Sequence, residues 1–400
     1  MKKKIYCFFV FFLFLSCSNQ TQQKLPLDGD YYTIDLDSKK DPSIPLSSLF
    51  KNVRAVILET NKDCLIGRVS GLQVFDGYIY VFDSSKAKSL FVFDLEGRFI
   101  RKIGSLGRGP GEYIEIHDFT LDTENRIIFL CDALNYIKKY QLDGTYLHTI
   151  TIQAPNSKAG FIQFYNGRLY SSQLWVEKSN DNFMLLEIDP SNGKILSSSL
   201  PVQYNKGWNE NFSDPLSRVF MSRANNPPRY NQMFMDYIVS IGKEITPYIE
   251  LKSNYLTTET DIESFRGKEG RRLNELNLIN SSKLFNVTCF IENDDFISFR
   301  FGMSRSSFVV IYYKKTGEVK LANYLSNDLI YKQDTKGLFG KFVFADEKGA
   351  YSILDTQLDD IDDFKSAIRN NETVPNLDKS DQLMKLTEES NPVIFFYEFK

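Results

Sequence analysis

The feature that most constrains this chain is a pattern of four short strands that occurs twice in succession between Val69 and Ile152. Each copy contains runs rich in β-branched and aromatic residues, separated by turns with Asp, Asn or Gly. The last turn is Glu96-Gly97 in the first copy and Asp143-Gly144 in the second. Four antiparallel strands of this kind form one blade of a β-propeller. The repeat therefore predicts an all-β propeller.

Glycines in the turn before the last strand of each copy give the length of the repeat. They stand at Gly97, Gly144, Gly193, Gly242 and Gly317. Consecutive glycines lie 47, 49, 49 and 75 residues apart. The last interval equals one blade plus an insertion of about 26 residues. We place this insertion at Thr257–Lys283, a polar segment with a helical pattern.

Six blades account for nearly every apolar run of the chain, so we predict a six-bladed β-propeller with four-stranded antiparallel blades and small helical insertions. Five blades are expected at residues 69–103, 117–152, 160–200, 215–252 and 284–324. The sixth is expected to combine residues 338–344, 350–354 and 391–397, with a helical excursion at 359–390. Val53–Leu58 should pair with Val393–Tyr397 as the outer edge of this blade, which closes the ring. A division into two domains near residues 201–230 is the alternative, although the repeat period continues across that stretch.

Residues 1–17 are typical of a targeting segment. Lys2–Lys4 carry positive charge, Ile5–Leu15 form an apolar run that is short for a transmembrane helix, and Ser16 precedes Cys17. The segment resembles a bacterial lipoprotein signal, which implies that Cys17 is acylated and becomes the first mature residue. An ordinary signal peptide cleaved nearby is the alternative. Residues 18–45 are then predicted to be a polar tether, and residues 46–400 the propeller.

Composition narrows the classes of function. The net charge of −3 gives no electrostatic reason to expect nucleic acid as a partner. The cysteines beyond Cys17 are Cys64, Cys131 and Cys289. They lack the spacing of metal ligands and are too few for a disulfide framework. We therefore expect neither a bound metal nor a cofactor.

A glycine-rich link, Gly104–Tyr113, joins the two copies of the repeat. With the strand Arg126–Asp132 and the turn at Gly144, it resembles an NHL-type repeat. The whole chain resembles the six-bladed β-propeller lipoproteins of Gram-negative anaerobes, many of which are domains of unknown function, on residues that include 236–251 and 391–397. The resemblance implies the architecture but says little about chemistry, because propellers include binding proteins, scaffolds and enzymes.

The first candidate ligand-binding residues are Arg108 and Glu112, in the glycine-rich link, and His117, which opens the next strand near the expected axis. A Walker-type phosphate loop would end in Lys-Ser/Thr and lead into a helix, and this link does neither. Its glycines are therefore interpreted as turn residues, although Arg108 and Glu112 can still project onto one face of the propeller.

The second candidate group is aromatic. Trp175, Trp208 and Tyr230 are predicted to lie in long or irregular connections of the third and fourth blades, with Arg229 beside them. Aromatic rings in such loops can stack on a sugar or a peptide. The alternative is that these segments fold back and bury their own rings.

No arrangement of nucleophile, base and metal ligands accompanies these residues. We interpret the chain as a monomeric, non-catalytic propeller that binds a glycan, a peptide or an envelope protein. Its lipid anchor would hold it on the outer or inner membrane, preferably the outer, facing the periplasm or the cell surface. The alternatives are a hydrolase or lyase acting on extracytoplasmic glycan or peptide, with acidic residues from different blades meeting at the channel mouth, and a structural subunit of a membrane complex.

Overall fold

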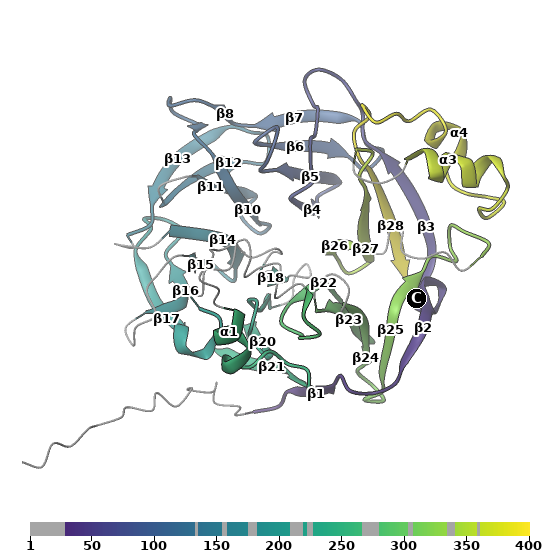
Figure 1. Cartoon of the computed structure of the whole chain (residues 1–400). Helices are drawn as coiled ribbons and strands as arrows, with labels where there is room; N and C mark the ends of the chain where they lie inside the picture. The colour runs from purple at the N-terminus through teal and green to yellow at the C-terminus, as the bar shows by residue number, and fades with distance from the viewer. Residues whose placement is uncertain are drawn as a thin grey trace, which may run out of the picture.

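The computed structural model is a six-bladed β-propeller, which confirms the predicted fold class (Figure 1). It describes residues 29–132, 135–153, 158–174, 182–208, 219–221, 227–265, 280–302, 307–333, 341–357 and 361–400. Each blade has four antiparallel strands, and the first strand of each lies nearest the common axis. The strands lie close to the five ranges predicted for blades 1–5.

Blades 1–3 are each built from one continuous stretch of chain. Blade 1 contains β4 (Gly71–Phe75), β5 (Tyr78–Asp83), β6 (Ser89–Asp94) and β7 (Phe99–Ile103). Blade 2 contains β10 (Ile116–Asp122), β11 (Ile127–Asp132), β12 (Tyr136–Gln141) and β13 (Tyr146–Thr151). Blade 3 contains β14 (Lys158–Tyr165), β15 (Arg168–Leu174), β16 (Phe183–Ile188) and β17 (Ile195–Pro201). The link between blades 1 and 2 forms a small parallel pair, β8 (Ser105–Leu106) with β9 (Glu112–Tyr113).

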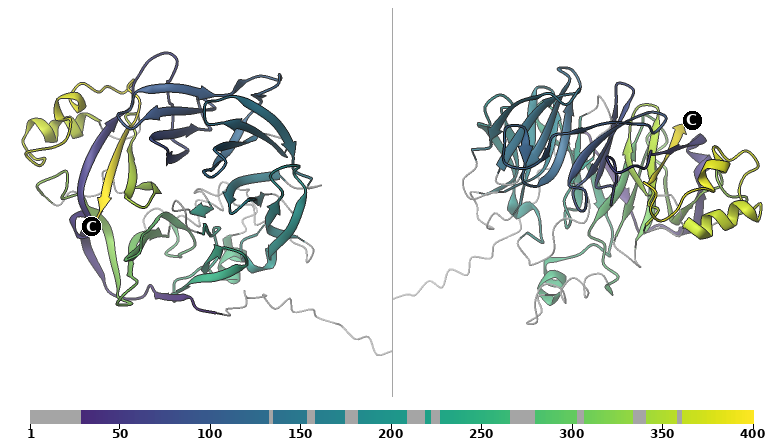
Figure 2. Two further views of the ribbon diagram at one scale, coloured as in Figure 1. Left: turned by 180° about the vertical axis from the view of Figure 1, so that it is seen from behind. Right: turned by 90° about the horizontal axis from the view of Figure 1, so that it is seen from above.

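Blades 4 and 5 follow the same order. Blade 4 contains β18 (Phe220–Met221), β19 (Arg229–Tyr230), β20 (Tyr237–Ile241) and β21 (Ile245–Lys252), after a short 3-10 helix, η3 (Val202–Tyr204). Blade 5 contains β22 (Val287–Glu292), β23 (Phe296–Phe301), β24 (Phe308–Tyr313) and β25 (Val319–Ser326). The helices α1 (Glu259–Phe265), α3 (Ile361–Arg369) and α4 (Ser380–Leu383) lie at the two predicted insertions. Figure 2 shows α1 projecting from the plane of the ring, and α3 and α4 outside its rim.

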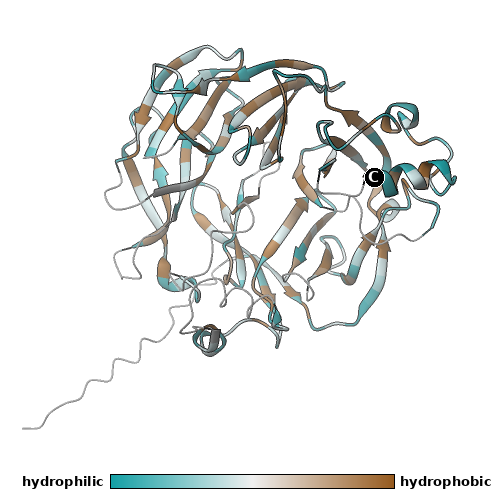
Figure 3. Cartoon of the chain, turned by 45° about the horizontal axis from the view of Figure 1, so that its top comes forward, coloured by the Kyte–Doolittle hydropathy of each residue, from teal (hydrophilic) through white to brown (hydrophobic). Residues whose placement is uncertain are grey.

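Burial follows the position of a strand within its blade. The middle strands β5, β6 and β11 are buried on both faces, because the neighbouring blades cover both sides of the sheet. The outer strands β7 and β13 are more exposed: β7 alternates between partly buried and exposed residues up to its buried last residue, and three of the six residues of β13 are exposed. Figure 3 shows apolar and polar residues alternating along many strands.

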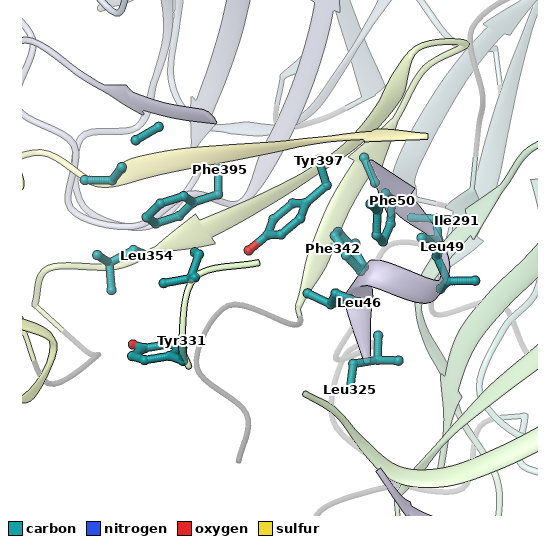
Figure 4. Close-up of a cluster of buried hydrophobic side chains, with 14 of the residues drawn as sticks. Leu46, Leu49, Phe50, Ile291, Leu325, Tyr331, Phe342, Leu354, Phe395 and Tyr397 are labelled. Atoms are coloured by element: carbon teal, nitrogen blue, oxygen red, sulfur yellow. The ribbon is translucent and has the colours of Figure 1, made fainter. Parts of the chain in front are cut away.

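Both ends of the chain close the ring, as predicted. Blade 6 contains β26 (Phe342–Ala345), β27 (Gly349–Leu354), β28 (Val393–Phe399) and β3 (Phe50–Ile57). β3 pairs antiparallel with β28, with Val53 opposite Tyr397. The centroid of the Phe50 ring lies 5.3 Å from that of Phe342 and 5.5 Å from that of Tyr397 (Figure 4). It also lies 5.5 Å from the centroid of the Phe399 ring. Aromatic pairs of this kind each contribute about 0.5–1.5 kcal/mol beyond their burial.

The segment before β3 was predicted to be part of a tether, and this prediction is wrong for residues 32–45. Residues 32–45 form two strands, β1 (Tyr32–Asp35) and β2 (Lys40–Pro45), which pair in parallel with β21 and β25 as fifth strands of blades 4 and 5. The buried apolar side chains of this segment are Ile34 in β1, Leu36 just after it and Ile44 in β2. We call residues 32–57 the belt, because they cover the outer edges of three consecutive blades, leading through the 3-10 helix η1 (Leu46–Ser48) into β3 (Figure 1). An uncovered edge would leave backbone N–H and C=O groups unpaired.

The predicted turn glycines all precede the fourth strand of their blade, and two of them show why glycine is needed there. A Cβ atom on Gly97 would lie 2.2 Å from the carbonyl oxygen of Ile57 in blade 6, and one on Gly193 would lie 2.1 Å from that of Thr151 in blade 2. Both glycines also have a positive φ, 91° and 77°. The turn of each of these blades therefore packs directly on the preceding blade.

A basic side chain of the preceding blade reinforces the same contact at three consecutive seams. Arg54 donates a hydrogen bond to the carbonyl oxygen of Leu95 at 3.4 Å. In the same way, Arg101 donates to that of Leu142 at 2.9 Å, and Lys139 to that of Pro190 at 3.2 Å. The repeat in sequence thus produces a repeat in the contacts between blades.

Candidate functional site

Because the strands of each blade are antiparallel, successive connections along the chain lie on opposite faces of the ring. One face, which we call the link face, carries the links between blades, among them residues 58–70 and 104–115, and the turns between second and third strands. The other, the turn face, carries the turns at Gly77 and Gly97. The long insertions, with α1, α3 and α4, all belong to the link face.

A cavity of about 770 Å³ lies on the link face between blades 1 and 6. We call it the seam cavity, because it lies where the ring closes. Its lining includes Thr60–Lys62, Leu65–Gly67, Lys86, Gln357, Glu389 and Ser390. Its volume is within the range of about 300–1,000 Å³ that is usual for small-molecule and cofactor sites.

Asn391 fixes one wall of the seam cavity. Its side-chain oxygen accepts a hydrogen bond from the N–H of Ile66 at 2.8 Å, and its side-chain nitrogen donates to the carbonyl oxygens of Glu59 at 2.6 Å and Cys64 at 2.7 Å. The residue is 1% exposed, so these hydrogen bonds are shielded from water. The segment just before β28 thus holds the loop that follows β3.

Asp83, the last residue of β5, fixes the other side. One carboxylate oxygen accepts hydrogen bonds from the N–H groups of Gly67 at 2.7 Å and Ala87 at 3.1 Å, and the other from that of Lys86 at 3.0 Å. Burial alone would raise the pKa of the Asp83 carboxyl group, but the backbone hydrogen bonds outweigh it and hold the pKa below its usual value. Asp83 is therefore a charged anchor for two segments that line the cavity.

The lining combines charges of both signs with uncharged polar groups. The ammonium group of Lys86 donates a hydrogen bond to the side-chain oxygen of Gln357 at 2.7 Å, which joins blade 1 to the segment after β27. Lys62 and Glu389 are exposed at the cavity, and Leu65 adds an apolar side chain. This arrangement can bind a ligand through charge, hydrogen bonds and one apolar contact.

The first group of predicted site residues lies elsewhere on the link face. The carboxylate of Glu112 accepts a hydrogen bond from the N–H of Gly109 at 2.7 Å, so it folds the glycine-rich link onto itself. Arg108 and His117 are exposed, and His117 lies at an irregularity where β10 shifts register with β11. Ligand binding by these residues stays a prediction.

The predicted aromatic group does not gather at a surface. Trp208 and Tyr230 belong to the core between blades 3 and 4, where they are 7% and 0% exposed. The hydroxyl of Tyr230 donates to the carbonyl oxygen of Met184 at 3.3 Å. Their burial argues against stacking on a ligand. Trp208, in the connection between blades 3 and 4, fits the alternative of a segment that buries its own ring, whereas Tyr230 lies in strand β19 and not in the predicted connection. Trp175 lies outside the described residues.

Arg229 is held in a buried charge cluster between blades 4 and 5. It donates two hydrogen bonds to the carboxylate of Glu292, at 3.0 and 3.1 Å, and Lys314 donates a third at 2.7 Å. The guanidinium carbon lies 3.5 Å from the ring centroid of Tyr248, whose hydroxyl also donates to Glu292. Arg229 thus joins two blades, a role that the sequence did not indicate because its partner is 63 residues away.

Charge and burial act in opposite directions on Glu292. Burial raises the pKa of its carboxyl group, but the hydrogen bonds and charges of Arg229 and Lys314 together hold the pKa below its ordinary value. A carboxyl group with a lowered pKa stabilises the folded protein fully above its unfolded pKa, and this contribution is lost as the pH falls through the folded pKa.

Within the described ranges, no helix is both long and apolar enough to span a bilayer. The same residues contain no cluster of three or more His, Cys, Asp or Glu side chains placed to hold a metal ion.

Comparisons with known proteins give a family and a fold. The family model described as "Domain of unknown function (DUF4934)" matches residues 31–398. The crystal structure of a Bacteroides fragilis protein assigned as exported matches with a TM-score of 0.72 at 18% identity, over 93% of this chain and 100% of that one. A member of the DUF4221 family from Bacteroides vulgatus matches with a TM-score of 0.52 at 12% identity, over 88% and 97% of the two chains. No curated protein matches. At these identities the structural likeness concerns the fold alone.

Glu292→Gln should destabilise the protein by about 3 kcal/mol at neutral pH, because it leaves buried cations without a carboxylate partner. Urea unfolding at pH 6 and pH 3 should show this difference from the unchanged chain shrinking toward low pH, where Glu292 itself becomes protonated. The control is Glu398→Gln, which removes an exposed ion pair with Lys51 and should have only a small effect. A loss that is the same at both pH values would contradict the assignment.

Proposed function

The chain belongs to the DUF4934 family, and we propose that it is a lipid-anchored protein of the cell envelope that binds a ligand in the seam cavity without transforming it. The construction of this cavity carries the proposal. Its walls come from segments far apart in the sequence, and two buried side chains, Asn391 and Asp83, hold those walls in place. Groups fixed before binding lose less entropy when a ligand arrives.

The buried carboxylates favour a binding function over hydrolysis, because they already take part in hydrogen bonds and ion pairs that stabilise the fold. In the described part of the chain they are Asp83, Asp118, Asp122, Asp132 and Glu292. The four aspartates accept hydrogen bonds from backbone N–H groups, and Glu292 is bound by cations. A hydrolase of the alternative kind needs two carboxyl groups that can exchange a proton with substrate or water. Groups engaged in this way serve the fold instead.

The charges of the seam cavity favour a peptide as its ligand. Lys62 and Lys86 provide positive charge and Glu389 negative charge, and Gln357 and Ser390 add uncharged hydrogen-bonding groups. A peptide segment offers charges of both signs and backbone amides to such a lining. A glycan is the competing ligand, and binding to a panel of peptides and oligosaccharides distinguishes the two.

The proposed cellular location is inferred mainly from the first residues of the chain. The segment that ends at Cys17 resembles a lipoprotein signal, and the structurally similar Bacteroides fragilis protein is assigned as exported. Both support an extracytoplasmic site, with the acylated Cys17 holding the belt and propeller near the membrane.

Metabolic labelling with radioactive palmitate in a Gram-negative host tests the anchor. The unchanged chain should carry label and sediment with membranes, and Cys17→Ser should lose the label because the acylated sulfur is absent. Cys7→Ser, within the apolar run, should remain labelled. Label retained by Cys17→Ser would contradict the proposed anchor.

A panel of immobilised decapeptides and oligosaccharides, probed with the full Cys17→Ser chain, tests the binding site. Peptides should be retained, and Lys86→Ala should weaken binding about tenfold or more, because a hydrogen bond to a charged group contributes about 1.5–3 kcal/mol. Lys315→Ala is the matched control, since this exposed lysine lies on the turn face. Retention of oligosaccharides alone would overturn the peptide assignment, and equal affinities for the Lys86 and Lys315 variants would overturn the site.

A further inference from the structure

A second cavity, of about 500 Å³, lies on the link face where the belt passes from blade 4 to blade 5. We call it the belt cavity. Its lining includes Asp37, Ser38 and Lys40 of the belt, Tyr255 and Ser282 of the link between blades 4 and 5, and Asn323 of β25. It shares no lining residue with the seam cavity.

Tyr255 is the most unusual residue of this lining. It is 56% exposed, the highest value for a large apolar side chain in the described ranges. Its backbone is nevertheless fixed, because its N–H donates to the hydroxyl of Ser253 at 3.0 Å and its carbonyl oxygen accepts from the N–H of Leu284 at 2.9 Å. When a ligand covers an apolar ring that is already held in place, the removal of that ring from water stabilises the complex.

Asp37 of the belt holds the loop that carries Tyr255. Its carboxylate accepts hydrogen bonds from the hydroxyl of Ser253 at 2.5 Å and from the backbone and side-chain nitrogens of Asn254 at 2.8 and 2.7 Å. These hydrogen bonds lower the pKa of Asp37 and so keep it ionised, and the one from Ser253 has the largest effect on the pKa. The carboxylate is thus engaged by the loop itself, and Tyr255 is presented from a braced segment.

The rest of the lining is mainly uncharged. The ammonium group of Lys40 lies 3.9 Å from the centroid of the Phe308 ring, which engages its charge. The remaining polar side chains of the lining are the hydroxyls of Ser38, Ser282 and Ser307 and the amide of Asn323.

An exposed aromatic ring beside hydroxyl and amide groups matches the two surfaces of a pyranose ring, whose C–H face stacks on aromatics and whose hydroxyls exchange hydrogen bonds. We propose that the belt cavity binds a sugar unit of a neutral glycan, stacked on Tyr255. The belt supplies part of this site and also leads toward the predicted anchor. The site is independent of peptide binding in the seam cavity.

Calorimetric titration of the full Cys17→Ser chain with maltohexaose, cellohexaose, xylohexaose and mannohexaose tests this site. At least one of the four should bind. Tyr255→Ala should weaken that binding at least tenfold, and Tyr255→Phe, which keeps the flat ring, should stay within threefold of the unchanged chain. Tyr255→Leu, which keeps apolar volume without an aromatic face, should behave like the alanine variant. Tyr136→Ala removes another exposed tyrosine, on β12, and should change nothing.

Lys86→Ala should leave sugar binding unchanged, which separates this site from the seam cavity. Each variant is checked by its unfolding midpoint in urea, and the leucine variant replaces the alanine variant if the latter does not fold. The proposal is overturned if none of the four oligosaccharides binds. It is also overturned if a folded Tyr255→Ala or Tyr255→Leu variant keeps the affinity of the unchanged chain.

Discussion

The pairing of β3 with β28 is the interaction on which the rest of this molecule depends. It joins residues more than 300 positions apart in the sequence and completes the only blade made from both ends of the described chain. Without it two sheet edges would lie open, and Phe50 would lose Tyr397 and Phe399, two of its four aromatic partners. The same closure brings Asn391 beside the loop after β3, so the seam cavity is a product of ring closure.

The contacts between blades use the same local features repeatedly. Glycine turns pack on the preceding blade, and aspartates at strand ends hold the links. Asp83 and Asp132 both end the second strand of a blade, and the carboxylate of Asp132 accepts hydrogen bonds from the N–H groups of Ile114 and Glu115, at 3.1 Å each. The seam cavity arises where this recurrent device meets the long insertion of blade 6, which supplies Glu389 and Ser390.

Sequence reasoning succeeded where local chemistry decides the structure. The strand period, the turn glycines and the closing strands are visible in short stretches of residues, and the structure contains them. The belt was missed because β1 and β2 bury few side chains and depend on edges far along the chain. Pro42 and Pro45 lie in β2, and an edge strand tolerates residues without an N–H.

The site residues were missed for a related reason. Burial of Trp208 and the partner of Arg229 depend on how blades meet, and the role of Asn391 appears only once both ends of the chain are together. The repeated aspartate at positions 83 and 132 was a usable signal for the braced links.

A cross-link across the closing pair tests the central claim most directly. Asn52 and Glu398 lie opposite each other on β3 and β28, and their side chains are joined by a hydrogen bond of 2.8 Å at an exposed position. Opposite residues on antiparallel strands have Cβ atoms about 4.5–5.5 Å apart, and those of a disulfide are about 3.5–4.5 Å apart, so the two ranges meet. Mild oxidation of the chain with Asn52→Cys and Glu398→Cys should therefore give an intramolecular disulfide between these positions, identified by mass spectrometry of its peptides, whereas pairing Asn52→Cys with Lys315→Cys should not. Failure of the first pair to cross-link while the protein remains folded would mean that the ring is not closed by its two ends.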